Sequence, residues 1–137
     1  RHRRPEPRVA WGALLGEERL ATAMIDISDG LSSDLAHLCH ESGVGARLEA
    51  RRIPIDPMAA RLCERLSLDP LEEALCGGED FELLFAVRPR HLSRLPKRLG
   101  GVFATYIGDV TDEMDGISIR EGQRLRALKA SGFMHFS

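Results

Sequence analysis

The chain has few cysteines and no long apolar run, and each absence argues against a class of protein. Its 137 residues include three cysteines, which are widely spaced and form no Cys-x-x-Cys pair. Isolated thiols in odd number are typical of reduced cysteines in a cytoplasm, so no disulfide framework is expected. No apolar stretch approaches the length that a bilayer requires, and the first residues lack the apolar segment of a signal peptide. We therefore expect a cytoplasmic protein without a membrane partner.

The chain also has little excess of either charge, because its formal net charge is only −2. A short basic arm precedes the first apolar stretch, with cationic side chains at Arg1, Arg3, Arg4 and Arg8. The balance over the whole chain gives little support to nucleic-acid binding, which is driven by contacts between cations and phosphates. Hydrophobic residues at 43% and charged residues at 29% describe one ordinary globular domain.

The most informative segment is Ile25-Asp26-Ile27-Ser28-Asp29-Gly30-Leu31, where an apolar strand is predicted to turn into an amphipathic helix. Asp is depleted in strands and neighbouring carboxylates repel, so Asp26 and Asp29 together indicate a positive ligand. Mg²⁺ fits, because one or two carboxylates commonly hold it while water and phosphate oxygens complete its octahedron. The N–H groups of a helix start favour anionic oxygens nearby.

The same residues have a simpler interpretation. Ser28 or Asp29 is of a type that caps a helix N-terminus without any ligand. Capping accounts for one polar residue of the segment and leaves Asp26 without a role, so the balance favours a functional site.

Periodicity predicts alternating strands and helices, and hence an α/β or α+β fold with a mixed sheet. The predicted elements, in chain order, are a helix over 9–15, a strand over 20–27, a helix from Leu31 to a stop at Gly43, a strand over 46–50, helices over 58–66 and 70–76, a buried strand over 81–87, a helix over 91–99, and strands over 102–107 and 117–120.

Two further features stand out along the chain. Gly77-Gly78-Glu79-Asp80 precedes the predicted buried strand, and its glycines would let the backbone pass close to a ligand, although a plain loop uses the same residues. Gly132-Phe133-Met134-His135-Phe136 places aromatic side chains late in the chain, and by itself it suggests only a tail packed on the core.

Two other groupings favour structural roles. His37, Cys39 and His40 share a predicted helix, while Cys63 and Cys76 lie elsewhere, and their spacing matches no zinc template. Leu92, Leu95 and Leu99 have the spacing of a helical packing stripe.

Taken in this order, the two polar clusters and the tail resemble thiamine-monophosphate kinases, relatives of aminoimidazole ribonucleotide synthetase and selenophosphate synthetase. The likeness runs through nearly the whole chain and also includes Ser42-Gly43-Val44-Gly45-Ala46 and Ile107-Gly108. The Asp-Ile-Ser-Asp-Gly-Leu and Gly-Gly-Glu-Asp blocks in series are specific to it. The family uses no Gly-Lys-Ser/Thr phosphate loop, and this chain has none. One departure is Met134, where the family usually has Asp.

The resemblance is to the C-terminal domain of those enzymes, and it implies that residues 1–137 form a single layered α/β/α domain with a mixed sheet. The N-terminal domain, which in the family forms most of the dimer core and much of the nucleotide site, is absent from this sequence. The expected protein partners are therefore that N-terminal domain and a second copy of the complete enzyme, with which it forms a homodimer.

The resemblance also implies ATP-dependent phosphorylation of thiamine monophosphate to thiamine diphosphate by direct in-line transfer. Carried over by position, Asp26 and Asp29 resemble Mg²⁺ ligands, and Ser28 resembles a contact to ATP. Glu79 and Phe133 resemble contacts to the thiamine phosphate. No residue is expected to act as a covalent catalyst, because phosphoryl transfer relies on positioning and charge neutralisation.

Two other functions stay open. The chain is alternatively a binding or assembly module that keeps the fold without chemistry, or part of another ATP-dependent enzyme of the same superfamily.

Overall fold

The computed structural model describes residues 7–76, 83–99 and 101–128 of the chain. The chain divides into two compact units, each of which combines two separate segments. The first unit joins Arg1–Asp26 to Glu82–Ala104, and the second joins Ile27–Phe81 to Thr105–Ser137. The division falls inside the first polar motif, so that Asp26 belongs to one unit and the residues after it to the other.

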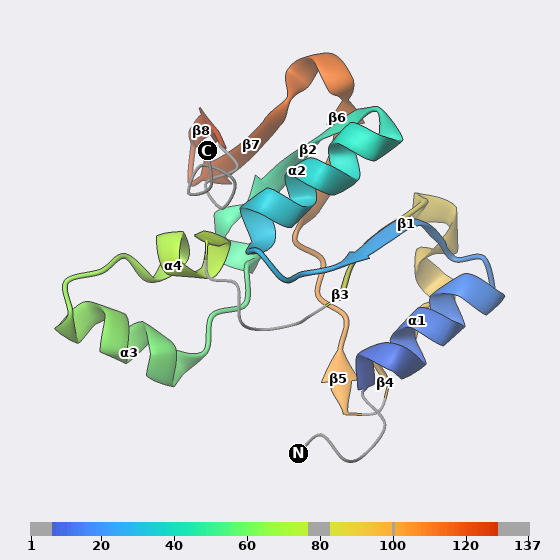
Figure 1. Cartoon of the computed structure of the whole chain (residues 1–137), viewed down its shortest axis with the longest axis horizontal. Helices are drawn as coiled ribbons and strands as arrows, with labels where there is room; N and C mark the ends of the chain where they lie inside the picture. The colour runs from blue at the N-terminus through green and yellow to red at the C-terminus, as the bar shows by residue number, and fades with distance from the viewer. Residues whose placement is uncertain (1–6, 77–82, 100, 129–137) are drawn as a thin grey trace. The chain divides into compact units, whose positions relative to one another are not determined.

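The first unit is built around a helix and an antiparallel strand pair (Figure 1). Trp11, Leu15 and Leu20 form its buried cluster. The Trp11 ring stacks on Phe85 with ring centroids 6.1 Å apart, and its indole N–H donates to the carbonyl of Val102 at 3.1 Å. The elements in chain order are α1 (Pro7–Glu17), β1 (Ala21–Asp26), β3 (Leu83–Val87), the 3₁₀ turn η2 (Pro89–Arg94), β4 (Arg98–Leu99) and β5 (Val102–Phe103).

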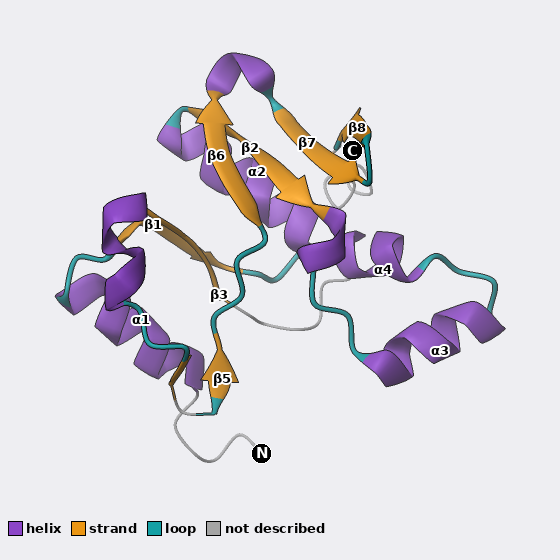
Figure 2. Cartoon of the chain, turned by 180° about the vertical axis from the view of Figure 1, so that it is seen from behind, coloured by secondary structure: helices purple, strands orange, loops and turns teal. Residues whose placement is uncertain are grey.

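The second unit contains a four-stranded sheet in the order β6-β2-β7-β8. The β2–β7 pair is parallel and the other pairs are antiparallel, so the expected mixed sheet is confirmed. Helix α2 packs against β2 (Figure 2). The elements are α2 (Leu31–Ser42), β2 (Val44–Glu49), η1 (Ala50–Arg52), α3 (Pro57–Arg65), α4 (Pro70–Cys76), β6 (Gly108–Asp112), η3 (Glu113–Asp115), β7 (Ile117–Glu121) and β8 (Arg124–Ala127).

Local sequence explains the helix ends. Leu31, Leu35 and Cys39 recur on one face of α2 and are buried, and Gly43 ends the helix in the left-handed conformation at φ 66°. Asp56 begins α3, because its carboxylate accepts a hydrogen bond from the amide of Ala59 at 3.1 Å. Both boundaries agree with the predicted helices.

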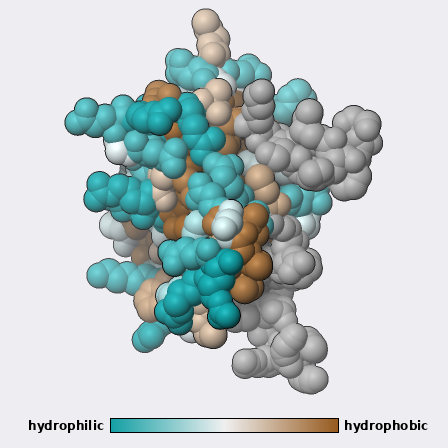
Figure 3. Space-filling model, turned by 90° about the vertical axis from the view of Figure 1, so that its left-hand side faces the viewer, coloured by the Kyte–Doolittle hydropathy of each residue, from teal (hydrophilic) through white to brown (hydrophobic). Residues whose placement is uncertain are grey.

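Helix α3 differs from α2 because it has no buried residue. Met58 and Leu62 on this helix and Leu66 after it are more than half exposed. On the side of the molecule in Figure 3, apolar surface lies between polar areas.

The predicted helix over 91–99 is wrong. The helical turn η2 ends at Arg94, and β4 begins at Arg98. Pro96 explains the difference, because its ring disfavours the helical conformation of the residue before it and removes a helix donor. Leu92 is accordingly exposed, whereas Leu95 and Leu99 pack against the Trp11 cluster.

Two predicted strands also need correction. The strand expected over 102–107 ends at Phe103, and the next strand, β6, begins at Gly108. In β3, Leu84 is buried but its neighbours are only half-buried, so the strand is less enclosed than its apolar sequence predicts. Strands β6 and β8 were not predicted.

Candidate active site

Asp26 lies at the C-terminal end of β1 in the first unit. Side chains along this strand alternate between half-buried and exposed, and Asp26 is on the exposed face with Thr22 and Met24. Its partner across the antiparallel pair is Leu83, the first described residue after 77–82. Asp26, near the start of the first polar motif, therefore lies beside β3, the strand that follows the second motif in the sequence.

Ser28 and Asp29 lie in the second unit, in the loop before α2, and both are exposed. Neither caps the helix. The N-cap residue is Gly30, with no side-chain cap hydrogen bond. Instead, one carboxylate oxygen of Asp34 accepts hydrogen bonds from the backbone amides of Ser28, at 2.7 Å, and Asp29, at 2.9 Å. The simple capping interpretation is thus wrong, and Ser28 and Asp29 point no side-chain oxygen at the helix N–H groups.

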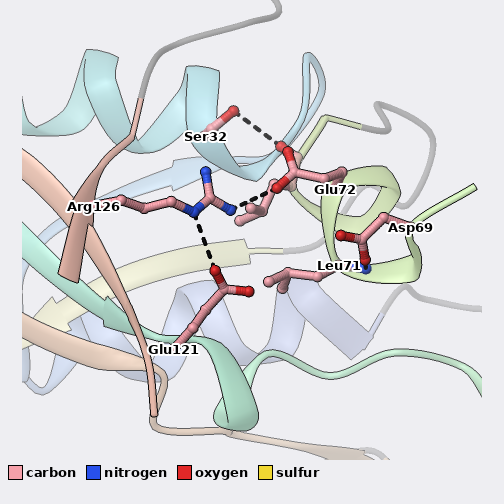
Figure 4. Close-up of polar contacts among 7 residues, drawn as sticks. Ser32, Asp69, Leu71, Glu72, Glu121 and Arg126 are labelled. Carbon is pink, nitrogen blue, oxygen red and sulfur yellow. Dashed lines mark hydrogen bonds and ion pairs between the residues drawn. The ribbon is translucent and has the colours of Figure 1, made fainter. Parts of the chain in front are cut away.

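The loop before α2 also touches the end of α4. A Cβ placed on Gly30 would lie 2.8 Å from the carbonyl oxygen of Cys76, and only glycine fits at this distance. In the first turn of α2, the buried Ser32 hydroxyl donates to the carbonyl of Leu75 at 3.1 Å. This bond is among the contacts in Figure 4. The helix that leads into Gly77-Gly78-Glu79-Asp80 is therefore fixed against the start of α2.

Each unit holds a contact that involves a residue of the first polar motif. Asp26 pairs with Leu83 in one unit, and Gly30 abuts Cys76 in the other. Glu79 and Phe133, the two candidate substrate contacts, lie outside the described residues.

The donor chemistry around Asp29 suits a divalent cation. Carboxylate oxygens of Asp29 and Asp34 and a ring nitrogen of His37 lie within 4.8 Å of one another. Oxygen-rich sites favour Mg²⁺, and Asp29 is exposed while Asp34 is buried. Asp29 is therefore free to meet a hydrated ion at the surface. The structure groups His37 with these carboxylates instead of with a cysteine.

The structure brings two further residues close to Asp29: Asp34, which the sequence analysis did not name, and His37, which it grouped with Cys39 and His40. Asp34 stands in the first turn of α2, where an acidic residue is ordinary for a helix start. The available signal was the position of Asp34, one turn beyond Gly30, from which an acidic side chain can fold back onto preceding N–H groups in the manner of a capping box.

A separate open cleft of about 490 Å³ is lined by Glu49, Arg51, Arg52 and Tyr106. The Arg52 guanidinium lies 5.1 Å from the centre of the Tyr106 ring, and the Tyr106 hydroxyl donates to Asp109 at 2.6 Å. That hydrogen bond raises the pKa of Tyr106. Of the motif residues that the structure describes, none lines the cleft.

Residues 5–120 match the family described as AIR synthase related protein, C-terminal domain. The chain belongs to this family. The AIR synthase-related fold agrees with the mixed sheet and helices described above. Across the described residues, no helix is long and apolar enough to cross a membrane.

Curated relatives of this AIR synthase-related chain confirm the resemblance drawn from its motifs. The thiamine-monophosphate kinase of Rhodopirellula baltica is 42% identical over 98% of this chain and 43% of its own length. The thiamine-monophosphate kinase of Escherichia coli K12 is 39% identical over 100% of this chain and 42% of its own length. The chain thus spans less than half the length of these relatives.

Solved structures agree with both the family and the fold. Thiamine monophosphate kinase from Aquifex aeolicus matches with a TM-score of 0.69 and 32% identity, over 90% of this chain and 38% of that one. The structure of AaThiL complexed with AMPPCP and TMP matches with a TM-score of 0.70 and 34% identity, over 87% of this chain and 36% of that one.

Proposed function

We propose that residues 1–137 are the C-terminal domain of a thiamine-monophosphate kinase, which transfers phosphate from ATP to thiamine monophosphate and forms thiamine diphosphate. The observation that carries the proposal is that Asp26, Ser28 and Asp29, the polar side chains of the first motif, are all exposed and so open to a ligand. A relative of this kind binds AMPPCP, an ATP analogue, together with TMP. The proposed setting is a cytoplasmic homodimer whose N-terminal domains complete the nucleotide site.

In this reaction an oxygen of the thiamine phosphate attacks the γ-phosphorus of ATP, the bond to the bridging oxygen breaks, and ADP leaves. Asp26 and Asp29 would hold Mg²⁺, which supplies charge neutralisation for the phosphates when bound. Ser28, which is exposed next to Asp29, would contact ATP through its hydroxyl. The work of this chain is positioning and electrostatics, and no side chain forms a covalent intermediate.

Glu79 and Phe133 are proposed as contacts to the thiamine monophosphate. Glu79 follows Gly77-Gly78 in the sequence, and glycines there would let the backbone bring its carboxylate close to a ligand. Phe133 would stack its ring on the heteroaromatic part of thiamine, as planar side chains do.

The test is a kinase assay on two proteins: the 137-residue chain, and the chain joined to the N-terminal domain expected for it. With ATP, Mg²⁺ and thiamine monophosphate, the joined protein should form thiamine diphosphate, and the chain alone should give none above background because half of the site is missing. Turnover by the chain alone would contradict the proposed division of the site. A joined protein that binds these ligands without turnover would be a binding module, and one that phosphorylates a different acceptor would be another enzyme of the superfamily.

A further inference from the structure

Asp34 is a carboxylate that the fold has buried, with 3% of its surface exposed. Burial of an ionised group is costly unless hydrogen bonds compensate for the lost water. Here the amides of Ser28 and Asp29 donate to the same oxygen, Oδ2, at 2.7 and 2.9 Å. Such charge-assisted bonds are about twice as strong as neutral ones. Asp34 is thus bound to the loop that precedes its own helix.

The position of these bonds is unusual for a helix start. In a capping box the side chain at the third helical position reaches back to the N-cap amide. Asp34 is one position further along α2, and it reaches beyond the N-cap residue Gly30 to the two residues before it. The bonds therefore leave the helix N–H groups alone and instead fix the backbone of the Ser28–Asp29 loop.

The fixed backbone determines where two exposed side chains point. Ser28 and Asp29 are both at the surface, so little packing is available to orient them. Gly30 has a φ of 113°, which residues other than glycine avoid. Because glycine is conformationally permissive, the backbone could turn at this position unless another contact held the loop. The carboxylate of Asp34 supplies that contact and anchors the loop.

We propose that Asp34 is a positioning residue for phosphoryl transfer: through the amides of Ser28 and Asp29 it holds the ATP contact and the metal ligand in reactive geometry, and it touches neither substrate. This inference rests on the function proposed above for Ser28 and Asp29. A direct metal-ligand role is the competing possibility, because Asp34 lies within the 4.8 Å cluster of Asp29 and His37.

Two substitutions separate these roles. Asp34→Asn keeps one acceptor oxygen of the same reach, so a positioning role predicts partial rescue, with kcat within about tenfold of wild type. Asp34→Ala removes the acceptor and should lower kcat by about 100-fold, the scale expected of a misplaced reacting group. The Michaelis constants should change less than kcat. A metal ligand needs the negative charge, so equal losses in Asp34→Asn and Asp34→Ala would overturn the proposal.

The matched control is Asp56→Ala, which removes another carboxylate-to-amide bond at the start of α3, away from the motifs. It should lower the melting temperature and leave kcat unchanged. A loss of kcat in Asp56→Ala comparable with that in Asp34→Ala would show a general effect of stability and would also overturn the proposal.

Amide hydrogen exchange on the 137-residue chain tests the anchor without any catalysis. Exchange at Ser28 and Asp29 should be fastest in Asp34→Ala, intermediate in Asp34→Asn and slowest in wild type, while exchange within α2 changes little. Equal rates in the three proteins would overturn the proposed anchor. A wild-type joined enzyme without kinase activity would refute the proposed function instead, and the exchange rates would still decide whether Asp34 anchors the loop.

Discussion

Gly30 and the carbonyl of Cys76 meet so closely that a Cβ on Gly30 would lie 2.8 Å from the oxygen. The two residues are distant in sequence: Gly30 belongs to the first polar motif, and Cys76 immediately precedes the second. The contact is between backbones, so no flexible side chain can move aside to admit a larger residue.

The first prediction concerns this contact. Gly30→Ala should lower the free energy of unfolding by about 1–3 kcal/mol or more, because it adds the steric overlap to a backbone conformation that is almost confined to glycine. In the joined enzyme it should also abolish most activity. Urea denaturation followed by circular dichroism measures the stability.

Gly43→Ala is the control for Gly30→Ala. Gly43 also has a positive φ, but nothing lies within 4 Å of its Cβ position. It should cost only about 1 kcal/mol, the conformational part of the effect. Equal losses in the two variants would show that the contact with Cys76 has no energetic weight.

The second prediction separates function from folding at the proposed metal site. Asp26→Asn and Asp29→Asn in the joined enzyme should each weaken Mg²⁺-dependent activity strongly, since each removes a ligand charge and almost no volume. Both carboxylates are exposed, so the melting temperature should change little. Initial rates across a Mg²⁺ titration, with melting curves on the same samples, provide the measurement. Wild-type rates in both variants would assign these residues to structure alone.

Much of the fold could be predicted because several elements carry their own boundaries. Helix α2 has an apolar face and a glycine stop, and α3 and α4 each begin at an Asp-Pro pair. The failures have equally local causes. Pro96 interrupts an apolar stripe that fits a helix, and β6 and β8 are polar, largely exposed strands with no alternation to reveal them.

The candidate site was only partly predictable. The polar types at Asp26, Ser28 and Asp29 are visible in one short stretch of sequence. The role of Asp34 depends on the chain folding back over Gly30, and the contact of that loop with Cys76 depends on tertiary packing. Neither contact leaves a periodic pattern in the sequence. The sequence therefore identifies the motif but not the contacts that hold its backbone in place.

The third prediction concerns the ion pairs between α4 and the β7–β8 hairpin. Arg126 contacts Glu72 of α4 at 2.6 Å and Glu121 of β7 at 3.2 Å (Figure 4). Hydrogen bonding to Glu121 raises the pKa of Arg126. Because the Arg126 and Glu72 side chains are 38% and 46% exposed, the Arg126–Glu72 coupling should be only about 0.2–1 kcal/mol.

A double-mutant cycle with Arg126→Met and Glu72→Gln measures that coupling, and Arg126→Met with Glu121→Gln serves as the comparison. The coupling should decrease in 1 M salt, where the Debye length is about 3 Å. A coupling well above this range, or one that salt leaves unchanged, would contradict the assignment of a solvent-screened pair.

The last prediction uses the buried thiol of Cys39, which lies on the packed face of α2 with 5% of its surface exposed. Burial raises the pKa of Cys39, because the thiolate would lose its water. The folded chain therefore holds this proton more tightly than the unfolded chain. The resulting stability is fully present below the ordinary thiol pKa of about 8.5 and is lost as the pH rises through the raised value.

Urea denaturation between neutral pH and pH 10 should show wild type losing stability more steeply than Cys39→Ala, which starts lower because it loses a packed sulfur. Cys63→Ala, on the exposed helix α3, should follow the wild-type slope. Parallel curves for wild type and Cys39→Ala would mean that ionisation of this thiol does not change the stability of the fold, which would contradict the prediction.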